Sequence, residues 1–414
     1  MRCRIGLDDT DHIESGCTTF TFDQLLRSLT DKLGCRVVER RLIRLWPFAK
    51  RRTRGNGSLG AIIDLPENLN EELEKICEDW FSELLLEISE FPESKFPASP
   101  CLAISYKPVP EKWYWDAVRK KVDPIPLVQE ATEEGVILLQ NGSSHGAVGA
   151  CAAISWEKGS NSSWELISWR HESMIGTSRR ISPNSVSELE DRFPETFLNR
   201  DPTKGRGLIA PRTPCPVLYG IRGSSPEAVE AAHFWLQSRS DVETARYYAI
   251  HHTNQASDDH IEGTNSGVAT SFPNEMKGGH AHISAYSSGK PVKLVAFNEG
   301  GPVNGLLRSL IPGDRVSWMG LVSPDGSIHL EKLKLDSPTA RISSRPICCS
   351  KTMRSSGFGQ KLRCLSCGRK EEKFWYCSDP DGPLDFPIDE WQEPPPSNRR
   401  HLSRPLSHGL PGTK

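Results

Sequence analysis

Apolar and polar positions alternate with two periods along the first part of the chain, and each period predicts a secondary structure. The segment Arg2–Leu7, RCRIGL, is predicted to be a short buried strand. Apolar residues then recur at helical spacing and predict an amphipathic helix over Thr19–Leu33, with Thr18 or Thr19 at its start. The next segments are predicted as extended over Arg36–Leu45 and Ala61–Leu65 and as helical over Asn68–Glu90. Strand and helix patterns continue to about residue 250, which predicts α/β or α+β architecture in at least two units.

After Gly263 the pattern changes to short runs typical of β-strands. Five runs occur, with a helix-like segment over Val303–Leu310 and a turn at Pro324–Gly326 between the later ones. The runs span Gly267–Ser271, His280–Tyr286, Val292–Phe297, Arg315–Val322 and Ser327–Leu335. Five strands with one helix favour an OB-fold β-barrel, and an SH3-like barrel is the alternative. The chain is therefore predicted to be an α+β multidomain protein.

Composition limits the location and the partners of the protein. The 414 residues carry 51 basic and 53 acidic side chains, so any preference for a charged partner must come from local patches. No apolar run approaches the roughly 18–20 residues that a membrane span requires, and the N-terminus lacks the pattern of a signal peptide. We therefore expect a cytoplasmic protein with no membrane partner.

The distribution of cysteines indicates one metal site. Seven of the twelve cysteines are scattered singly in apolar stretches, and the last five cluster. The two-residue spacing between Cys364 and Cys367 lets both thiolates bind one tetrahedral zinc ion, as in half of a zinc ribbon. The other half is predicted to be the adjacent pair at positions 348 and 349, and Cys377 or His401 is the alternative to one of that pair.

Basic residues gather in two segments that favour nucleic acid. Arg341–Lys373 holds nine basic residues against two acidic ones, and Arg36–Arg54 holds eight against one, interleaved with Trp46 and Phe48. Cations bind phosphates, and aromatic rings stack on unpaired bases. The alternatives are a solvated basic face and core aromatics beside a basic loop. The polar run Thr253–His260 is predicted to give hydrogen bonds to a nucleotide rather than to bind a metal.

A glycine-rich loop offers a second kind of phosphate contact. The segment Gly55–Gly60, GNGSLG, matches the spacing of a dinucleotide fingerprint, but it leads into a predicted strand where that fingerprint requires a helix. No P-loop motif occurs in the sequence. Arg51–Gly57 is instead a cationic loop whose backbone N–H groups and guanidiniums could hold polyphosphate. An ordinary basic turn is the other interpretation.

Three carboxylates, Asp8, Asp9 and Asp11, follow the first predicted strand. Crowded carboxylates repel one another unless a cation binds between them, and Mg²⁺ binds one or two carboxylates together with phosphate oxygens. The predicted helix start at Gly16–Thr19 presents N–H groups to an anion and places a threonine hydroxyl within reach of a phosphoryl group. These residues favour a Mg²⁺–nucleotide site. In the alternative, Asp11 caps a turn and Thr18 caps the helix.

Together these segments resemble the archaeal tRNA-isoleucine 2-agmatinylcytidine synthetase family over nearly the whole chain. The motifs are GLDDTD (Gly6–Asp11), GCTT (Gly16–Thr19), RLIRLWP (Arg41–Pro47), TRGNG (Thr53–Gly57), ELISWR (Glu165–Arg170), VLYGIRG (Val217–Gly223), TNQASDDH (Thr253–His260), KGGH (Lys277–His280), the cysteine ribbon and RHLSRPL (Arg400–Leu406). Three features depart from the family pattern. The first cysteine pair is contracted, Cys215 stands where an aspartate is expected, and Asn298–Leu307 lacks the usual basic and aromatic residues.

The resemblance implies a fold and an activity. The family combines a kinase-like domain, a ferredoxin-like domain, an OB-fold and a zinc ribbon. Its members modify the wobble cytidine of the isoleucine tRNA with the anticodon CAU, so that the codon AUA is read. The 2-oxo oxygen is phosphorylated at the expense of ATP, and the amine of agmatine then attacks the activated ring carbon. ATP ends as AMP and diphosphate, and a threonine matching Thr18 is autophosphorylated.

The resemblance and the residues together define the expected domains and sites. The predicted domains are residues 1–127, kinase-like and ATP-binding; 128–262, ferredoxin-like and agmatine-binding; 263–337, an OB-fold that binds tRNA; and 338–414, a zinc ribbon and tail that bind tRNA. The predicted catalytic residues are Asp8, Asp9, Asp11 and Thr18, with Mg²⁺, and the predicted ATP-phosphate contacts are Arg54, Gly55, Asn56 and Gly57. The predicted tRNA contacts are Arg44, Lys50, Arg52, Asn254, Gln255, Lys361 and Arg363. The predicted zinc ligands are Cys348, Cys349, Cys364 and Cys367, and the candidate partners of the agmatine guanidinium are Glu165, Glu172, Glu188 and Asp191.

Two functions of other classes stay open. A metal-dependent phosphohydrolase or nuclease would use the same aspartates and would cleave RNA or nucleotide without agmatine. A non-catalytic tRNA-binding protein would bind tRNA without ATP turnover. The threonine argues weakly against the first alternative, and the aspartates combined with the threonine argue against the second.

Overall fold

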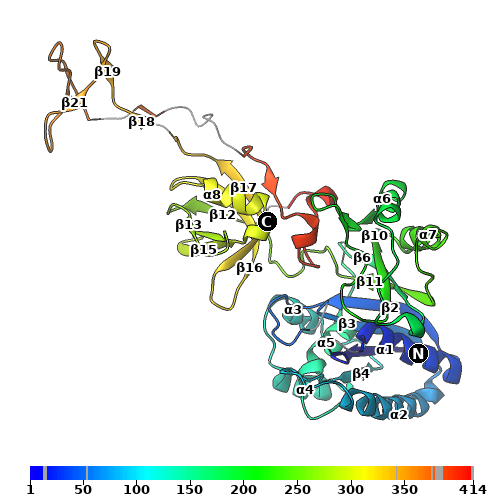
Figure 1. Cartoon of the computed structure of the whole chain (residues 1–414). Helices are drawn as coiled ribbons and strands as arrows, with labels where there is room; N and C mark the ends of the chain where they lie inside the picture. The colour runs from blue at the N-terminus through cyan, green and yellow to red at the C-terminus, as the bar shows by residue number, and fades with distance from the viewer. Residues whose placement is uncertain are drawn as a thin grey trace. The chain divides into compact units, whose positions relative to one another are not determined.

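A computed structural model describes residues 1–12, 16–52, 55–159, 161–341, 343–373, 376–377 and 386–411 of the chain (Figure 1). The chain forms two compact units. Unit 1 comprises Met1–Glu262 and Pro395–His408, and unit 2 comprises Gly263–Pro394 and Gly409–Lys414. The chain therefore leaves unit 1, forms unit 2 and returns to unit 1 with its last segment.

A nine-stranded sheet forms the centre of unit 1, with the strand order β5-β4-β1-β3-β2-β11-β6-β10-β7. Its strands are β1 (Arg2–Asp8), β2 (Arg36–Arg44), β3 (Gly57–Asp64), β4 (Cys101–Ser105), β5 (Ile137–Gln140), β6 (Ser163–Trp169), β7 (Thr196–Phe197), β10 (Val217–Gly223) and β11 (Tyr247–Thr253). Strands β2 and β11 pair in parallel, and the other neighbouring pairs are antiparallel. A separate hairpin joins β8 (Arg200–Asp201) to β9 (Arg206–Gly207). The parallel pair joins the two halves of the sheet.

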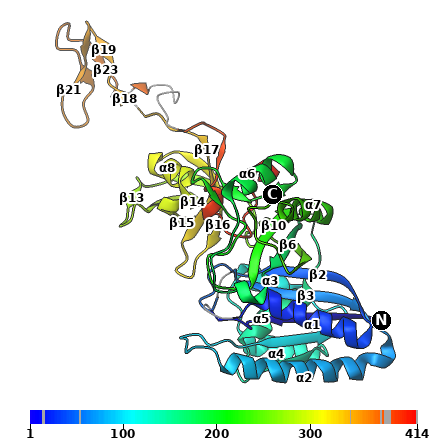
Figure 2. The ribbon, with the colours of Figure 1, turned by 45° about the vertical axis from the view of Figure 1, so that its right-hand side comes forward.

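Successive side chains of a strand point to opposite faces of the sheet, and apolar residues occur on both faces. Helices therefore cover the sheet. The helices of unit 1 are α1 (Thr18–Leu33), α2 (Asn70–Ser89), α3 (Lys112–Arg119), α4 (Pro124–Glu133), α5 (His145–Ser155), α6 (Pro183–Arg192) and α7 (Pro226–Gln237). Ile5 and Leu7 share one apolar core with Phe22 of α1 and Phe81 of α2. A second core joins β4 to α3, α4 and α5, and a third joins β6 and β10 to α6 and α7. Figure 2 shows the long helix α2 along the outside of the first half.

The predicted domain boundary after residue 127 falls within a helix. A domain boundary between residues 127 and 128 would cut α4, because Leu127 and Ala131 of this helix pack in the same core as α5. The glycine-rich segment Asn141–Gly149 is helical from His145 onward. Small residues allow this helix to pack closely against the sheet. Glycines are unfavourable within helices, so the sequence pattern does not indicate a helix here.

Unit 2 contains a closed five-stranded barrel. Its strands and its helix are β12 (Asn265–Ala269), β14 (Ala281–Ser287), β15 (Lys290–Ala296), α8 (Pro302–Ser309), β16 (Arg315–Val322) and β17 (Ile328–Ser337). The barrel closes because β12 pairs with both β14 and β16. Val303 and Leu306 of α8 pack with Trp318 in the barrel core. The five predicted strands and the predicted helix are thus confirmed within a few residues.

The rest of unit 2 consists of short strands. They are β13 (Asn274–Glu275), β18 (Ser343–Ser344), β19 (Ile347–Cys348), β20 (Lys351–Thr352), β21 (Arg354–Ser355), β22 (Leu362–Arg363), β23 (Lys370–Glu371), β24 (Tyr376–Cys377) and β25 (Trp391–Gln392). Strands β19 and β20 form a hairpin, and β21, β22 and β23 form a small sheet. Within the described part of the chain, no helix combines the length and the apolar character that a membrane crossing requires.

Candidate active site and metal centre

Asp8 ends strand β1 in the middle of the first half of the sheet, where β1 pairs with both β3 and β4. Its side chain lies against Gly149 of α5. A Cβ atom at position 149 would come within 1.8 Å of Asp8 Oδ2, so the carboxylate occupies space that only a glycine leaves open. Asp9 follows in the left-handed region, with φ of 57°. The backbone thus turns sharply at the aspartates.

The electrostatics of this cluster favour a bound cation. Burial, together with the neighbouring charge of Asp9, raises the pKa of Asp8 well above its usual value. Burial also raises the pKa of Asp9 to about 7, with Arg51 opposing and Asp11 adding to the shift. Crowded, partly buried carboxylates repel one another when they are ionised, and a bound divalent cation relieves that repulsion. Asp8, Asp9 and Asp11 thus supply carboxylates of the kind that Mg²⁺ binds, although among the described residues only the four cysteines of unit 2 bring their ligand atoms together at one point.

Thr18 is the first residue of helix α1 and does not cap it. The capping position is Cys17, which has extended backbone and makes no capping hydrogen bond; its sulfur lies 3.1 Å from the Thr19 hydroxyl instead. The hydroxyl of Thr18 makes no hydrogen bond within the described residues, although Thr18 is only 6 % exposed. A Cβ at Gly16 would lie 3.4 Å from the Asp11 Cα, so the helix begins beside the aspartates. The alternative in which Thr18 caps the helix is wrong.

The glycine-bearing loop between β2 and β3 makes room for an arginine. A Cβ at Gly55 would come within 2.3 Å of Arg44 Nη1, and the same nitrogen donates to the Gly55 carbonyl at 3.1 Å. Asn56 has φ of 46°, and its amide donates to the Trp46 carbonyl at 2.9 Å. Gly57 is the first residue of β3. Arg54, the fourth predicted phosphate contact, lies outside the described residues.

Two arginines and one glutamate form a buried charge cluster that the sequence did not predict. Arg44 Nη2 lies 3.0 Å from Glu165 Oε2, and Arg222 Nε lies 3.3 Å from Glu165 Oε1. Burial would raise the pKa of Glu165, but Arg222 and Arg44 outweigh it and lower that pKa to about 2. With its amide oriented to suit both neighbours, Gln255 donates to Glu165 at 3.0 Å and accepts from Arg222. In the sequence, the only indication of this cluster is the single charged residue within each of the otherwise uncharged strands β6 and β10.

Asn254 and Gln255 are buried, although a tRNA-binding surface was predicted for them. Asn254 Oδ1 accepts from the Arg44 backbone N–H at 2.8 Å, and its Nδ2 donates to the Arg44 carbonyl at 2.9 Å and to the Tyr114 hydroxyl at 3.0 Å. The two residues are at most 1 % exposed. Their amides, like the Arg44 side chain, hold the strands together. A direct contact with RNA would require these amides to become exposed.

The other predicted tRNA contacts are accessible. Lys50 and Arg52 are exposed in the loop after β2, and so are Lys361 and Arg363 near the cysteines. Phe48 lies in the same loop as Lys50, with Trp46 edge-on at 5.5 Å. The four cations are accessible to a nucleic acid, whereas the Phe48 ring already has the Arg400 guanidinium 5.0 Å from its centre.

The four predicted metal ligands come together. One sulfur from each of the four cysteines lies within 4.8 Å of all the others, so the set could hold a metal ion. The residues are Cys348, Cys349, Cys364 and Cys367. Positive φ values of 48° at Cys349 and 60° at Ser350 turn the backbone, which allows two adjacent cysteines to face one point. Backbone N–H groups of Cys367 and Ser366 lower the pKa of Cys364 to about 6, which favours the thiolate. The side chain of Cys377 lies outside the described residues.

The carboxylates considered for agmatine differ in availability. Glu165 is already neutralised by two arginines, so it cannot also serve a free guanidinium without releasing them. Glu172 pairs with Arg246 at 2.5 Å and Glu188 with Arg239 at 3.5 Å, both near the surface. Asp191 is exposed. Cys215, at the position where an aspartate was expected, is a buried thiol that accepts from Arg179 at 3.3 Å.

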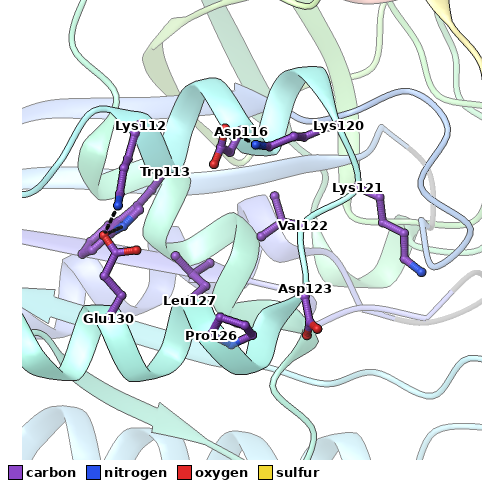
Figure 3. Close-up of a pocket in the computed structure, with 10 residues that line it drawn as sticks. All are labelled: Lys112, Trp113, Asp116, Lys120, Lys121, Val122, Asp123, Pro126, Leu127 and Glu130. Carbon is purple, nitrogen blue, oxygen red and sulfur yellow. Dashed lines mark hydrogen bonds and ion pairs between the residues drawn. The ribbon is translucent and has the colours of Figure 1, made fainter.

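A separate hollow of about 350 Å³ lies between α3 and α4 (Figure 3). Lys112 pairs with Glu130 at 2.7 Å, and Lys120 pairs with Asp116 at 2.9 Å. These pairs leave little uncompensated charge in the hollow. Its lining residues do not include the aspartates at the end of β1, so it has no direct part in their chemistry.

Comparison with known proteins decides among the open functions. Two family models match the chain, the TiaS TCKD domain over residues 4–141 and the TiaS FLD domain over residues 144–260. A protein of Cenarchaeum symbiosum, named as the isoleucine-tRNA 2-agmatinylcytidine synthetase TiaS, is 32% identical over 98% of this chain and 92% of its own length. The chain belongs to the TiaS family.

Solved TiaS structures agree with this assignment. The crystal structure of TiaS in complex with its isoleucine tRNA and ATP has a TM-score of 0.82 and 28% identity, covering 99% of this chain and 98% of its own. A complex of TiaS with the same tRNA, AMPCPP and agmatine has a TM-score of 0.79 and 25% identity, with the same coverage of both chains. The boundary between the two TiaS family models falls between residues 141 and 144, after α4 and before α5.

Proposed function

We propose that this chain is an isoleucine-tRNA 2-agmatinylcytidine synthetase. It uses ATP to join agmatine to the wobble cytidine of the isoleucine tRNA with the anticodon CAU, so that the codon AUA is read. The observation that carries the proposal is the aspartate cluster at the end of β1, beside Thr18, whose hydroxyl does not cap helix α1. The relatives of the chain match it over nearly their full length. Neither a simple phosphohydrolase nor a tRNA-binding protein without catalysis would need both features.

The aspartates and the helix start would bind and orient the nucleotide. Asp8, Asp9 and Asp11 would hold Mg²⁺, which neutralises charge on the phosphates when it is bound. The N–H groups at the start of α1 face an anion favourably, and the Thr18 hydroxyl is free to accept a phosphoryl group. Arg54 and the Gly55–Gly57 loop would steady the phosphates.

The reaction replaces a poor leaving group by a good one. A ring carbonyl oxygen does not leave when an amine attacks, whereas a phosphorylated oxygen leaves as phosphate. The cytidine oxygen therefore takes a phosphoryl group first. The agmatine amine then forms a bond to the ring carbon, the carbon–oxygen bond breaks, and the amine loses a proton. The wobble base must unstack to enter the site, which costs little in an anticodon loop.

The parts of the chain have separate roles in the proposal. The kinase-like part reaches to about residue 141, and the ferredoxin-like part, with agmatine binding, runs from there to residue 262. The barrel over 263–337 is an OB-fold, supported by its five closed strands and by a helix between the third and the fourth. The remaining residues form a zinc ribbon in which the four cysteines bind one Zn²⁺.

The tRNA is held mainly through charge and stacking. Lys50 and Arg52, with Phe48 in the same loop, suit a phosphate backbone beside an unpaired base. Lys361 and Arg363 are a second group of exposed cations, on the ribbon. The enzyme is expected in the cytoplasm, where tRNA is modified.

One assay tests the proposed function. Purified protein is incubated with ATP, radiolabelled agmatine and the transcript of the CAU-anticodon isoleucine tRNA, and label in the tRNA is counted. We expect ATP-dependent transfer and none to a transcript whose wobble base is uracil. RNA cleavage without transfer would support a nuclease, and tight tRNA binding without ATP turnover would support a binding protein. Either result would overturn the proposal.

A further inference from the structure

The last segment of unit 1, Pro395–His408, comes after unit 2 in the chain and lies against the loop that follows β11. The backbone N–H of Ala256 donates to the His401 carbonyl at 2.9 Å, and that of Asp258 donates to the Leu402 carbonyl at 2.8 Å. Leu402 is 1 % exposed, so a buried side chain anchors the segment as well. The segment therefore holds two backbone N–H groups of that loop.

The two loop residues that the segment holds have left-handed backbone. The angle φ is 59° at Ala256 and 63° at Asp258, in a region that residues other than glycine seldom adopt. A further contact supports Asp258, whose carboxylate accepts from the Arg404 backbone N–H at 2.8 Å. Backbone of this kind persists only where the surrounding structure holds it. The conformation of the loop after β11 therefore depends on the segment.

The same loop begins with Asn254, whose buried amide binds both backbone groups of Arg44, the last residue of β2. Its oxygen accepts from the Arg44 N–H at 2.8 Å, and its nitrogen donates to the Arg44 carbonyl at 2.9 Å. The nitrogen also donates at 3.0 Å to the Tyr114 hydroxyl, which donates to the Asp259 carboxylate of the loop at 2.5 Å. A change in the loop would therefore release the end of β2.

Arg44 in turn fixes the backbone of the glycine-bearing loop between β2 and β3. Its Nη1 donates to the Gly55 carbonyl at 3.1 Å, and a Cβ at Gly55 would come within 2.3 Å of that nitrogen. The neighbouring Leu45 N–H donates to the Asn56 carbonyl at 3.0 Å. A series of hydrogen bonds, joined by short stretches of backbone, thus leads from the C-terminal segment through Asn254 and Arg44 to this loop.

We propose that the segment Pro395–His408 positions the loop Gly55–Gly57 through Asn254, so that ATP binding depends on the last segment of unit 1. The inference rests on the proposed function, in which this loop steadies the phosphates of ATP, and it adds the residues that hold the loop in place. Asn254 and Leu402 are positioning residues, since both act through others. A loop that shifts presents misaligned donors to the phosphates, and the affinity for ATP falls.

The variant Leu402→Asp tests the proposal, because a carboxylate at a site that is 1 % exposed favours release of the segment. Hydrogen exchange measures the release, and the N–H groups of Ala256 and Asp258 should lose protection. In the agmatine-transfer assay the KM for ATP should rise on the order of tenfold, whereas the KM for agmatine should stay near that of the wild type. An unchanged KM for ATP, an equal rise in both KM values or full protection of the two N–H groups would overturn the inference.

The matched control is Leu410→Asp, which introduces the same charge at a side chain that is already 75 % exposed. Both KM values should stay as in the wild type. Wild-type protein that fails to transfer agmatine would contradict the proposed function, whereas active wild type with an unaffected Leu402→Asp contradicts only the positioning of the loop.

A double variant tests the route through Asn254. Because the segment acts through this residue, Asn254→Ala combined with Leu402→Asp should have the same KM for ATP as Asn254→Ala alone. Fully additive effects of the two substitutions would contradict the route. Leu402→Ala, and Tyr114→Phe at the hydroxyl that Asn254 binds, are the milder substitutions for the same comparison where a first variant does not fold.

Discussion

Arg44 and Glu165 form an ion pair of 3.0 Å between strands β2 and β6, which lie on either side of β11 in the sheet. Both side chains are nearly buried, at 11% and 4% exposed. Arg222 lies on the other oxygen of the same carboxylate at 3.3 Å. This one carboxylate therefore links the first half of the sheet to the second and balances two buried cations.

Glu165→Gln should strongly destabilise the fold. The glutamine keeps the shape but leaves two buried guanidiniums without a counter-charge, and breaking a buried pair costs about 3–5 kcal/mol. Chemical unfolding followed by circular dichroism measures the loss. Glu172→Gln is the control, because Glu172 is 72% exposed in its pair with Arg246 and should leave stability almost unchanged. Equal stability of Glu165→Gln and wild type would mean that the pair does not hold the sheet together.

The same carboxylate predicts a dependence of stability on pH. The folded-state pKa of Glu165 is lowered from 4.5 to about 2. Its stabilising contribution is therefore complete above pH 4.5 and is lost as the pH falls toward 2. The difference in unfolding free energy between wild type and Glu165→Gln should accordingly shrink over that interval. A difference that stays constant from pH 6 to pH 3 would contradict the low pKa.

Asp9→Asn should abolish turnover while stabilising the metal-free protein. Asp9 has a folded-state pKa raised to about 7, so its ionised form opposes folding, and stability falls as the pH rises from 3.8 through 7. The amide removes that cost, and the melting temperature at pH 8 without Mg²⁺ should rise. Agmatine transfer should fall on the order of 10²-fold or more, because a ligand of the cation is lost. Added Mg²⁺ should stabilise the wild type and not the variant.

The sequence predicted the elements with local patterns and missed those that depend on distant partners. The barrel strands were found because each alternates between one apolar face and one polar face. The Arg44–Glu165–Arg222 cluster was missed because its members are far apart in sequence and meet only through the pairing of β2, β6, β10 and β11. Buried polar residues look like surface residues until their partners are known.

The candidate site likewise has features that the local sequence predicts and features that depend on distant residues. Asp8, Asp9 and Asp11 were recognisable because they follow one another, whereas the need for Gly149 beside Asp8 follows only from the packing of α5 on the sheet. The glycines of the loop after β2 were assigned to phosphate, and the structure gives Gly55 a second reason, the space for Arg44. Spacing in the sequence cannot distinguish a glycine that admits a ligand from one that admits a side chain.

Cys364→Ser should remove the metal and weaken tRNA binding. Cys364 is 1 % exposed and its sulfur belongs to the cluster of four, so a serine removes one thiolate of a tetrahedral site. Native mass spectrometry should find about one zinc in the wild type and none in the variant. Cys35→Ser, at another buried cysteine, should keep the zinc. Zinc-free wild type with undiminished tRNA affinity would remove the ribbon from tRNA binding.

Thr18 offers the sharpest test, because its hydroxyl has no structural partner among the described residues. A valine of similar shape therefore costs little in the packing of α1, and Thr18→Val should melt within a few degrees of wild type. If the hydroxyl accepts a phosphoryl group, the same variant should scarcely modify tRNA, and Thr18→Ser should keep partial activity. Incubation with γ-labelled and β-labelled ATP, followed by mass spectrometry of the protein, should find phosphate on wild type and none on Thr18→Val. Wild-type modification rates in Thr18→Val would show that the threonine of this chain is not the acceptor.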